Sequence, residues 1–263
     1  MDGPREYTAN FYRGCSHGCV YCYAPSLIHD DREWGGFVDV KVNAPAVLGR
    51  ELKGVRKGVV FLSSASDPYQ PAEARYKVTR SALEALLQND FPVVILTRSP
   101  LILRDLDLLK RFSWLRVGFS ISSLPGRLYE PGVAPIDRRI ESLRILGAAG
   151  VKTWVSMAPL VSGMMGIDIR ELLDKLRAAG VSSVSAGMLR FQGYGESKEM
   201  FERVSGVAFS EVSAGAEATL AEARRLIDEF GFEQRASFFE WKPEGGLDRY
   251  LSEEARGVST PIS

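Results

Sequence analysis

Apolar segments and amphipathic segments alternate along the first two thirds of the chain. The apolar segments are short, which is typical of strands that are buried on both faces of a sheet. They lie at residues 59–62, 93–96, 115–121, 151–157 and 181–186. The segments between them carry apolar residues at helical spacing and therefore predict helices. These helices are expected at residues 76–88, 101–111, 137–149 and 169–178.

The joints between the predicted helices and strands are short. Gly150-Val151 and Gly180-Val181 repeat one junction, in which a helix ends at glycine and a strand begins at valine. Strands and helices that alternate with such short joints predict a parallel sheet with helices outside. With a further strand at 7–11, six units predict an α/β fold, a partial (β/α)6 TIM-type barrel with parallel strands. A complete eight-stranded barrel is the alternative, and it would need strands from the C-terminus.

The alternation stops after Arg190. A glycine-rich aromatic loop is expected at 191–195, a helix at 215–230 and a last strand at 237–241. We therefore expect residues 1–190 to form the barrel core and residues 191–263 to form a C-terminal helical and strand extension that packs on the same domain.

Composition and charge narrow the class of protein. The 263 residues are 45% hydrophobic, which supports one large core and disfavours a disordered chain. Lys plus Arg and Asp plus Glu both number 33, so net charge does not favour nucleic-acid binding. No apolar run approaches the roughly 20 residues of a membrane helix, and the N-terminus lacks the apolar core of a signal peptide. We expect a cytoplasmic protein without a membrane partner.

All three cysteines of the chain lie in one loop with the spacing C-x3-C-x2-C, at Cys15, Cys19 and Cys22. Thiolates this close in sequence predict a metal site. A closed structural zinc site takes four ligands, whereas three cysteines on a [4Fe–4S] cluster leave one iron open to another ligand. A zinc site that adds His17 or His29 is the alternative. The odd number of cysteines disfavours a disulfide framework.

This motif, with Tyr21 before its last cysteine, resembles the signature of radical S-adenosylmethionine enzymes. The wider segment NFYRGCSHGCVYCYA and the Asp-Pro-Tyr-Gln-Pro segment at 67–71 are similar to the spore photoproduct lyase-like branch of that superfamily. The resemblance implies a [4Fe–4S] cluster on Cys15, Cys19 and Cys22, with S-adenosylmethionine chelating the open iron. It also implies that one electron from the cluster cleaves S-adenosylmethionine to a 5′-deoxyadenosyl radical, which acts on an unidentified substrate. A ferredoxin- or flavodoxin-like electron donor is the implied partner.

The resemblance also nominates residues that bind S-adenosylmethionine. Parallel α/β barrels place their active sites at the carboxyl ends of the strands, which is where these residues fall. Ser66 and Asp67 are expected to hold the amino group of the cofactor. Arg98 is expected to bind its carboxylate, because a guanidinium can grip a carboxylate with two hydrogen bonds.

Further cofactor contacts are expected from the Cys loop and from later strand ends. Tyr21 lies between the second and third cysteines. By strand alternation Ser120 and Ser122 share a face and are expected to reach the ribose or the carboxylate. The resemblance points Arg138 toward the cofactor or substrate, and Val161 belongs to a segment expected to pack against adenine.

Two other functions remain alternatives. The named relatives repair a thymine dimer in DNA, and a basic aromatic groove built from Arg190, Phe191, Tyr194 and Trp241 would favour a nucleic-acid repair lyase. The neutral net charge disfavours it, as does the lack of the additional cysteine that donates hydrogen in the well-known bacterial lyases. A non-enzymatic Fe–S or zinc binding module is the other alternative, and it predicts a fully ligated metal.

Overall fold

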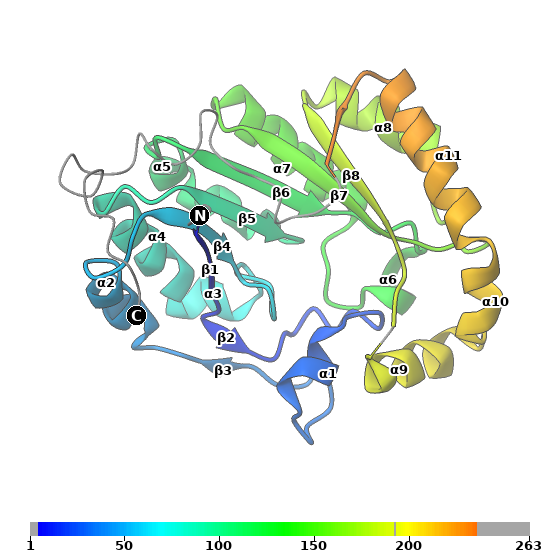
Figure 1. Ribbon diagram of the computed structural model, residues 1–263, viewed down its shortest axis with the longest axis horizontal. Coiled ribbons are helices and arrows are strands. Elements are labelled where there is room, and N and C mark those ends of the chain that lie inside the picture. Colours follow the sequence, from blue (N-terminus) through cyan, green and yellow to red (C-terminus); the bar gives the residue numbers. More distant parts are fainter. Residues whose placement is uncertain (1–4, 192, 236–263) are drawn as a thin grey trace, which may run out of the picture.

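The computed structural model describes residues 5–191 and 193–235 of the chain, and an open sheet of seven parallel strands runs through this part (Figure 1). The strands occur in the order β1-β4-β5-β6-β7-β8-β9, and each is paired in parallel with its neighbours. Their bounds are β1 Arg5–Ala9, β4 Gly58–Leu62, β5 Val93–Thr97, β6 Leu115–Ser120, β7 Thr153–Leu160, β8 Ser183–Met188 and β9 Glu233–Gln234. The predicted α/β fold with a partial barrel of parallel strands is confirmed.

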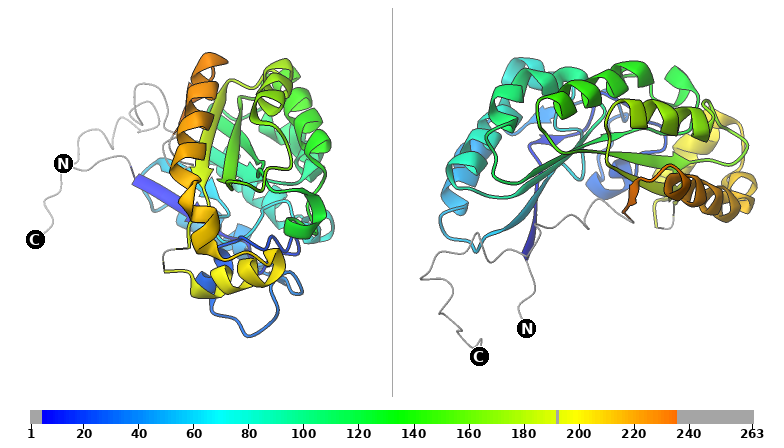
Figure 2. Two further views of the ribbon diagram at one scale, coloured as in Figure 1. Left: turned by 90° about the vertical axis from the view of Figure 1, so that its right-hand side faces the viewer. Right: turned by 90° about the horizontal axis from the view of Figure 1, so that it is seen from above.

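Helices cover the outer face of the curved sheet (Figure 2). The helices that connect or flank the strands are α2 Ala44–Glu51, α4 Val78–Gln88, α5 Leu106–Leu109, α7 Ile136–Ala148, α8 Ile169–Ala178 and α11 Ala216–Glu229. Within the described residues β1 and β9 are the two edges of the sheet, so the barrel stays open. The helices α1 Ala24–Ile28, α6 Gly126–Tyr129 and α9 Gly195–Ser205 lie at the end of the sheet to which the strand arrows point (Figure 1).

Each strand sends alternate side chains to the two faces of the sheet. On the helix side, Val60, Ile95 and Val117 belong to the large apolar core. On the concave side, a smaller cluster fills the barrel interior, and Trp154 is its largest fully buried member. Gly118 makes room for that ring, because a Cβ atom there would lie 2.2 Å from Cε2 of Trp154.

The helix predicted at 76–88 is two helices in the structure, α3 Ala72–Tyr76 and α4. Lys77 between them adopts a left-handed φ of 52°. The buried Glu73 carboxylate accepts hydrogen bonds from the N–H groups of Thr79 and Arg80, and so caps the first turn of α4. The chain has to reverse at Lys77 for this cap to form.

Three other segments differ from the prediction. The helix expected at 101–111 is a 3₁₀ turn, η1 Pro100–Asp105, followed by the single turn α5. Apolar and charged residues alternate at 37–42 and predict a half-exposed strand there. Only β3 Asp39–Val40 forms, and it pairs antiparallel with β2 Tyr12–Arg13 in a separate two-stranded sheet. The strand expected at 237–241 lies outside the described residues.

The described residues beyond 190, which end at residue 235, return to the same sheet. The helix predicted at 215–230 is confirmed as α11, and β9 pairs with β8. Two helices that were not predicted precede it, α9 and α10 Phe209–Ala214. Within residues 5–191 and 193–235, no helix has the length and apolar character needed to cross a membrane.

We predict that Gly118→Ala destabilises the protein by about 1–3 kcal/mol, because the added methyl group overpacks the barrel interior against Trp154. Urea unfolding followed by circular dichroism measures the change. Gly195→Ala is the matched control, since a Cβ atom there meets no atom within 4 Å. Equal unfolding free energies for the two variants would contradict this packing.

Candidate active site

A cavity of about 470 Å³ opens at the carboxyl ends of the strands. The sheet contributes Leu96, Ser120, Ser156 and Ala158 to the lining of this cavity. These residues follow the alternation that places side chains on the concave face of the sheet. The loop that carries the cysteines lies across this end of the barrel, and Cys15, Cys19 and Cys22 all line the cavity. The predicted position of the site, at the carboxyl ends of parallel strands, is therefore where the structure has its cavity.

The cysteine loop has a shape fixed by close backbone contacts. Gly14 adopts a φ of +79°, and a Cβ atom there would lie 2.4 Å from the carbonyl oxygen of Phe37. On the opposite side, the N–H of Gly132 donates to the carbonyl oxygen of His17 at 3.0 Å. A Cβ atom at Gly132 would lie 2.3 Å from the Ser16 carbonyl oxygen, so only glycine allows this approach.

The thiols in this loop are sheltered from water. Cys15 and Cys19 are buried, and Cys22 is half-buried. Burial raises the pKa of the Cys19 and Cys22 thiols to about 11, so both are protonated at neutral pH in the metal-free chain. Binding of a metal or cluster as thiolates therefore releases protons from these two residues.

Several buried polar atoms around the cavity have no hydrogen-bond partner among the described residues. They include Oγ of Ser63, Oγ of Ser66 and Nε1 of Trp34, and all three residues line the cavity. A buried polar group without a partner is costly. These atoms fit a site that receives a polar ligand.

Asp67 also lines the cavity, but its carboxylate is already engaged by the protein. Oδ1 accepts from the Tyr69 N–H at 2.8 Å and from Thr97 Oγ1 at 2.6 Å, and Oδ2 accepts from the Arg98 N–H at 2.7 Å. Oδ2 also lies 3.4 Å from Nδ1 of His17 in a buried ion pair. Burial raises the pKa of Asp67, but His17 and these hydrogen bonds outweigh it and hold that pKa below its usual value.

A second carboxylate, Glu130, joins two arginines beneath the cysteine loop. Its Oε2 accepts from Arg139 at 2.8 Å, its Oε1 lies 3.7 Å from Nε of Arg98, and Tyr21 donates to it through its hydroxyl. Burial raises the pKa of Glu130, but Arg139 and Arg98 outweigh it and lower the pKa. Glu130 thus remains ionised and lies within ion-pair distance of the Arg98 guanidinium, which is at the wall of the cavity.

The structure brings most of the nominated residues together. Besides the three cysteines, those that line the cavity are Tyr21, Ser66, Asp67, Arg98 and Ser120. The other three lie outside its lining: Ser122, Arg138 and Val161.

There is a physical reason why each of these three residues lies outside the lining. β6 ends at Ser120, so strand alternation does not reach Ser122, whose hydroxyl donates to Glu130 instead. Arg138 is exposed, whereas Arg139 is on the buried stripe of α7 and donates to the Ser120 carbonyl oxygen at 2.7 Å. Val161 packs in an apolar cluster behind the cysteine loop.

One wall of the cavity was not predicted. It comes from Tyr23 and Trp34 after the cysteines, from Met188 at the end of β8 and from Leu189 directly after it. Tyr194, named only as part of a nucleic-acid groove, completes this wall, and its ring lies 5.8 Å from that of Tyr23. The strand predicted at 181–186 ends close to Met188. The rule that active sites lie at the carboxyl ends of parallel strands could therefore have nominated Met188 and Leu189.

The segment after β8 also shelters the cysteines. Phe191, Phe201 and Val212 form one buried apolar cluster with Cys19 and Tyr21. α9 is tied to α1 by a hydrogen bond between the Ser26 and Ser197 hydroxyls at 3.0 Å. Residues 191–212, apart from residue 192, are thus part of the enclosure of the cysteine loop.

Sequence comparison finds relatives in archaea, bacteria and a phage. An uncharacterized protein of Methanocaldococcus jannaschii is 34% identical over 168 residues, which cover 62% of this chain and 63% of that protein. An uncharacterized protein of Mycobacterium tuberculosis is 34% identical over 205 residues, which cover 72% of this chain and 60% of that protein. The radical SAM Nalpha-GlyT isomerase of Pseudomonas phage M6 is 27% identical over 249 residues, covering 89% and 50%. The chain spans about 60% of the length of the first two relatives.

Solved structures share the fold. Spore photoproduct lyase complexed with dinucleoside spore photoproduct matches with a TM-score of 0.65 and 17% identity, over 85% of this chain and 74% of that one. Streptococcus suis SuiB bound to S-adenosylmethionine matches with a TM-score of 0.57 and 17% identity, over 92% of this chain and 53% of that one. The sequence model of the Radical SAM superfamily matches residues 9–176, more than half of the chain. The chain therefore belongs to the radical SAM superfamily.

Proposed function

We propose that this chain binds a [4Fe–4S] cluster through Cys15, Cys19 and Cys22 and reductively cleaves S-adenosylmethionine. The observation that carries the proposal is that all three cysteines of a radical SAM chain line one cavity, together with partnerless polar atoms. When bound, the reduced cluster and S-adenosylmethionine supply a 5′-deoxyadenosyl radical for chemistry on a substrate.

The three cysteines suit a cluster better than a single zinc ion. Among the described residues, no three side chains of Cys, His, Asp or Glu converge on one ion position. A cluster distributes its cysteine ligands over different irons, so its ligands need not converge on one point. Of the two histidines of the zinc alternative, His17 lines the cavity beside the cysteines but pairs through Nδ1 with Asp67. His29 is exposed at the end of α1.

For S-adenosylmethionine, the cavity offers groups of matching chemistry. Arg98 presents a positive charge for the carboxylate, and its Nε has no hydrogen-bond partner among the described residues. The hydroxyls of Ser63, Ser66 and Ser120 line the same cavity. Asp67 holds the backbone N–H of Arg98, so its first role is to position that residue. A single-electron donor of the ferredoxin or flavodoxin type is the proposed partner.

A nucleic-acid substrate is the second candidate. Tyr23, Trp34 and Tyr194 offer aromatic rings at the cavity, and Arg190 is an exposed cation there. Aromatic rings beside a cation can stack on a nucleobase and bind phosphate. One structural neighbour is complexed with dinucleoside spore photoproduct, and one relative is named a GlyT isomerase. Of the other groove residues predicted from the sequence, Phe191 is buried and Trp241 lies outside the described residues.

We predict that Cys19→Ala lowers bound iron at least fivefold and abolishes formation of 5′-deoxyadenosine, because the cluster loses one of three ligands. The protein is reconstituted anaerobically with iron and sulfide, reduced and given S-adenosylmethionine. Mass spectrometry then quantifies 5′-deoxyadenosine and methionine. Ser210→Ala, at an exposed position on α10, is the control. Full iron content and turnover in Cys19→Ala would contradict the assignment of the ligands.

We predict that Arg98→Ala raises the Kd for S-adenosylmethionine at least tenfold while iron content stays unchanged. A lost charge-assisted hydrogen bond of about 1.5–3 kcal/mol accounts for this change. Anaerobic equilibrium dialysis of the cluster-loaded protein measures the Kd. Arg177→Ala removes an exposed arginine of α8 and is the control. A Kd for Arg98→Ala equal to that of the control would show that Arg98 does not bind the cofactor.

A further inference from the structure

The segment of residues 67–73 forms a regular array beside the cysteine loop. The N–H of Gln70 donates to the carbonyl oxygen of Asp67 at 3.4 Å, and the N–H of Glu73 donates to that of Gln70 at 2.9 Å. Side chains three residues apart lie on one side of a chain with this hydrogen-bond pattern. Asp67, Gln70 and Glu73 therefore share one face, and all three are buried.

Each of these three side chains contacts a different part of the cysteine loop and its approach. Glu73 accepts a hydrogen bond from the hydroxyl of Tyr12, three residues before the first cysteine. Asp67 pairs with His17 at 3.4 Å. Gln70 lies between them and contacts the backbone on both sides of Cys15. The 67–73 segment thus follows the loop from Tyr12 to His17.

Gln70 uses both ends of its amide. Oε1 accepts from the backbone N–H of Ser16 at 3.0 Å, and Nε2 donates to the backbone carbonyl oxygen of Gly14 at 3.2 Å. The side chain is 0% exposed, so water does not replace it. Without Gln70, a donor and an acceptor of the loop backbone would lose their partners inside the protein.

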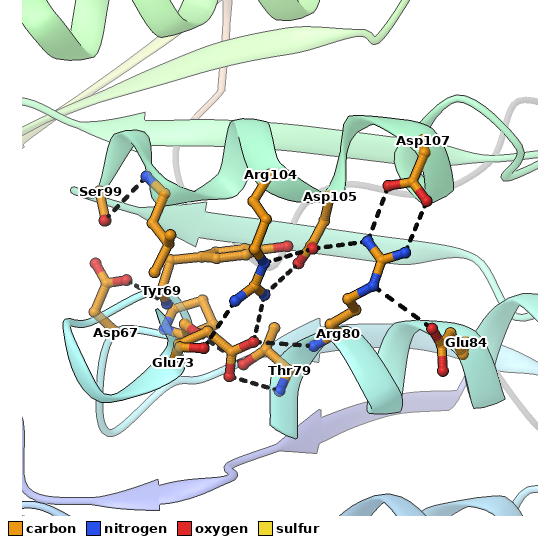
Figure 3. Close-up of polar contacts among 12 residues, drawn as sticks. Asp67, Tyr69, Glu73, Thr79, Arg80, Glu84, Ser99, Arg104, Asp105 and Asp107 are labelled. Carbon is orange, nitrogen blue, oxygen red and sulfur yellow. Dashed lines mark hydrogen bonds and ion pairs between the residues drawn. The ribbon is translucent and has the colours of Figure 1, made fainter. Parts of the chain in front are cut away.

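The far end of the 67–73 segment is anchored to the helices. Arg104 donates to the Glu73 carboxylate at 2.6 Å and to its carbonyl oxygen at 2.8 Å (Figure 3). Arg104 and Arg80 both pair with the buried Asp105. Glu73 also caps α4 through the Thr79 N–H. The contacts to the cysteine loop therefore start from a rigid base.

We propose that Gln70 is a positioning residue, and that the 67–73 segment holds the cysteine loop in its cluster-binding shape before the cluster arrives. The inference rests on the proposed cluster-binding function. From the sequence, Asp67 at the start of this segment and Ser66 directly before it are expected to bind the amino group of S-adenosylmethionine. In the structure, the side chains of Asp67, Gln70 and Glu73 form hydrogen bonds with other groups of the protein, which gives the segment a supporting role. A loop arranged in advance loses less conformational entropy when it binds its ligand.

The test compares Gln70→Met with Gln88→Met in the 263-residue chain. Methionine keeps the volume of Gln70 and removes both hydrogen bonds, whereas Gln88 is exposed at the end of α4. Backbone amide exchange, resolved by residue with NMR on the metal-free protein, is expected to be at least tenfold faster at Ser16 in Gln70→Met. The exchange rates of the amides of β5 and β6 should stay unchanged. A general loss of stability would instead raise the exchange rates in these strands as well.

A second readout is the cluster itself. After anaerobic reconstitution, Gln70→Met should hold at most half of the iron and sulfide of wild type, and Gln88→Met should hold the full amount. Gln70→Glu keeps an oxygen that accepts from the Ser16 N–H. It replaces the Nε2 donor to the Gly14 carbonyl with a second oxygen, so that hydrogen bond is lost and two oxygens face each other. It should restore slow exchange at Ser16 and still hold at most half of the wild-type iron.

The outcomes separate the two proposals. Unchanged Ser16 exchange in Gln70→Met, or full iron content in spite of fast exchange, would overturn the role of Gln70. If Gln70→Met does not fold, Gln70→Glu decides, and full iron content there overturns the role. If wild type itself binds no cluster while Ser16 exchange responds as expected, the proposed function fails and the contact between Gln70 and the loop stands.

Discussion

A buried loop has to find hydrogen-bond partners for its backbone, and this constraint shapes the whole cysteine end of the molecule. The loop is irregular, so it cannot satisfy itself as a helix or strand does. Gln70 supplies a donor and an acceptor from one side, and Gly132 approaches from the other. The N–H of Val20 donates to the carbonyl oxygen of Tyr129 on that second side. The positions of the three thiols follow from these backbone contacts.

The barrel gives the loop a rigid floor and an enclosed space. Trp154 and its neighbours fill the interior of the sheet, and the cavity begins where the concave-face side chains become small or polar, as at Ser120 and Ala158. The half-buried Arg98 and the buried Glu130 and Arg139 then set the charge at the wall of the cavity. Low exposure strengthens each of these ion pairs relative to a surface pair.

Much of this arrangement could be predicted from the sequence, because strand ends in a parallel sheet meet at one edge. That rule places the cysteines, Ser66 and Arg98 around one cavity. Helical spacing could also have chosen Arg139 over Arg138, since Arg139 lies in the i, i+3, i+4, i+7 pattern with Ser142, Leu143 and Leu146. The role of Gln70 could not be predicted, because its two partners are backbone atoms 54 and 56 residues away. Backbone groups leave no mark in a sequence pattern.

The proposed function requires that the three cysteines hold a four-iron cluster with one iron open to S-adenosylmethionine. Iron and sulfide analysis of the reconstituted protein, together with electron paramagnetic resonance of its reduced form with and without S-adenosylmethionine, tests this requirement. We expect about four irons and four sulfides per chain, and a spectrum that changes when S-adenosylmethionine is added. A single metal ion per chain, or a cluster spectrum that S-adenosylmethionine leaves unchanged, would contradict the proposed function.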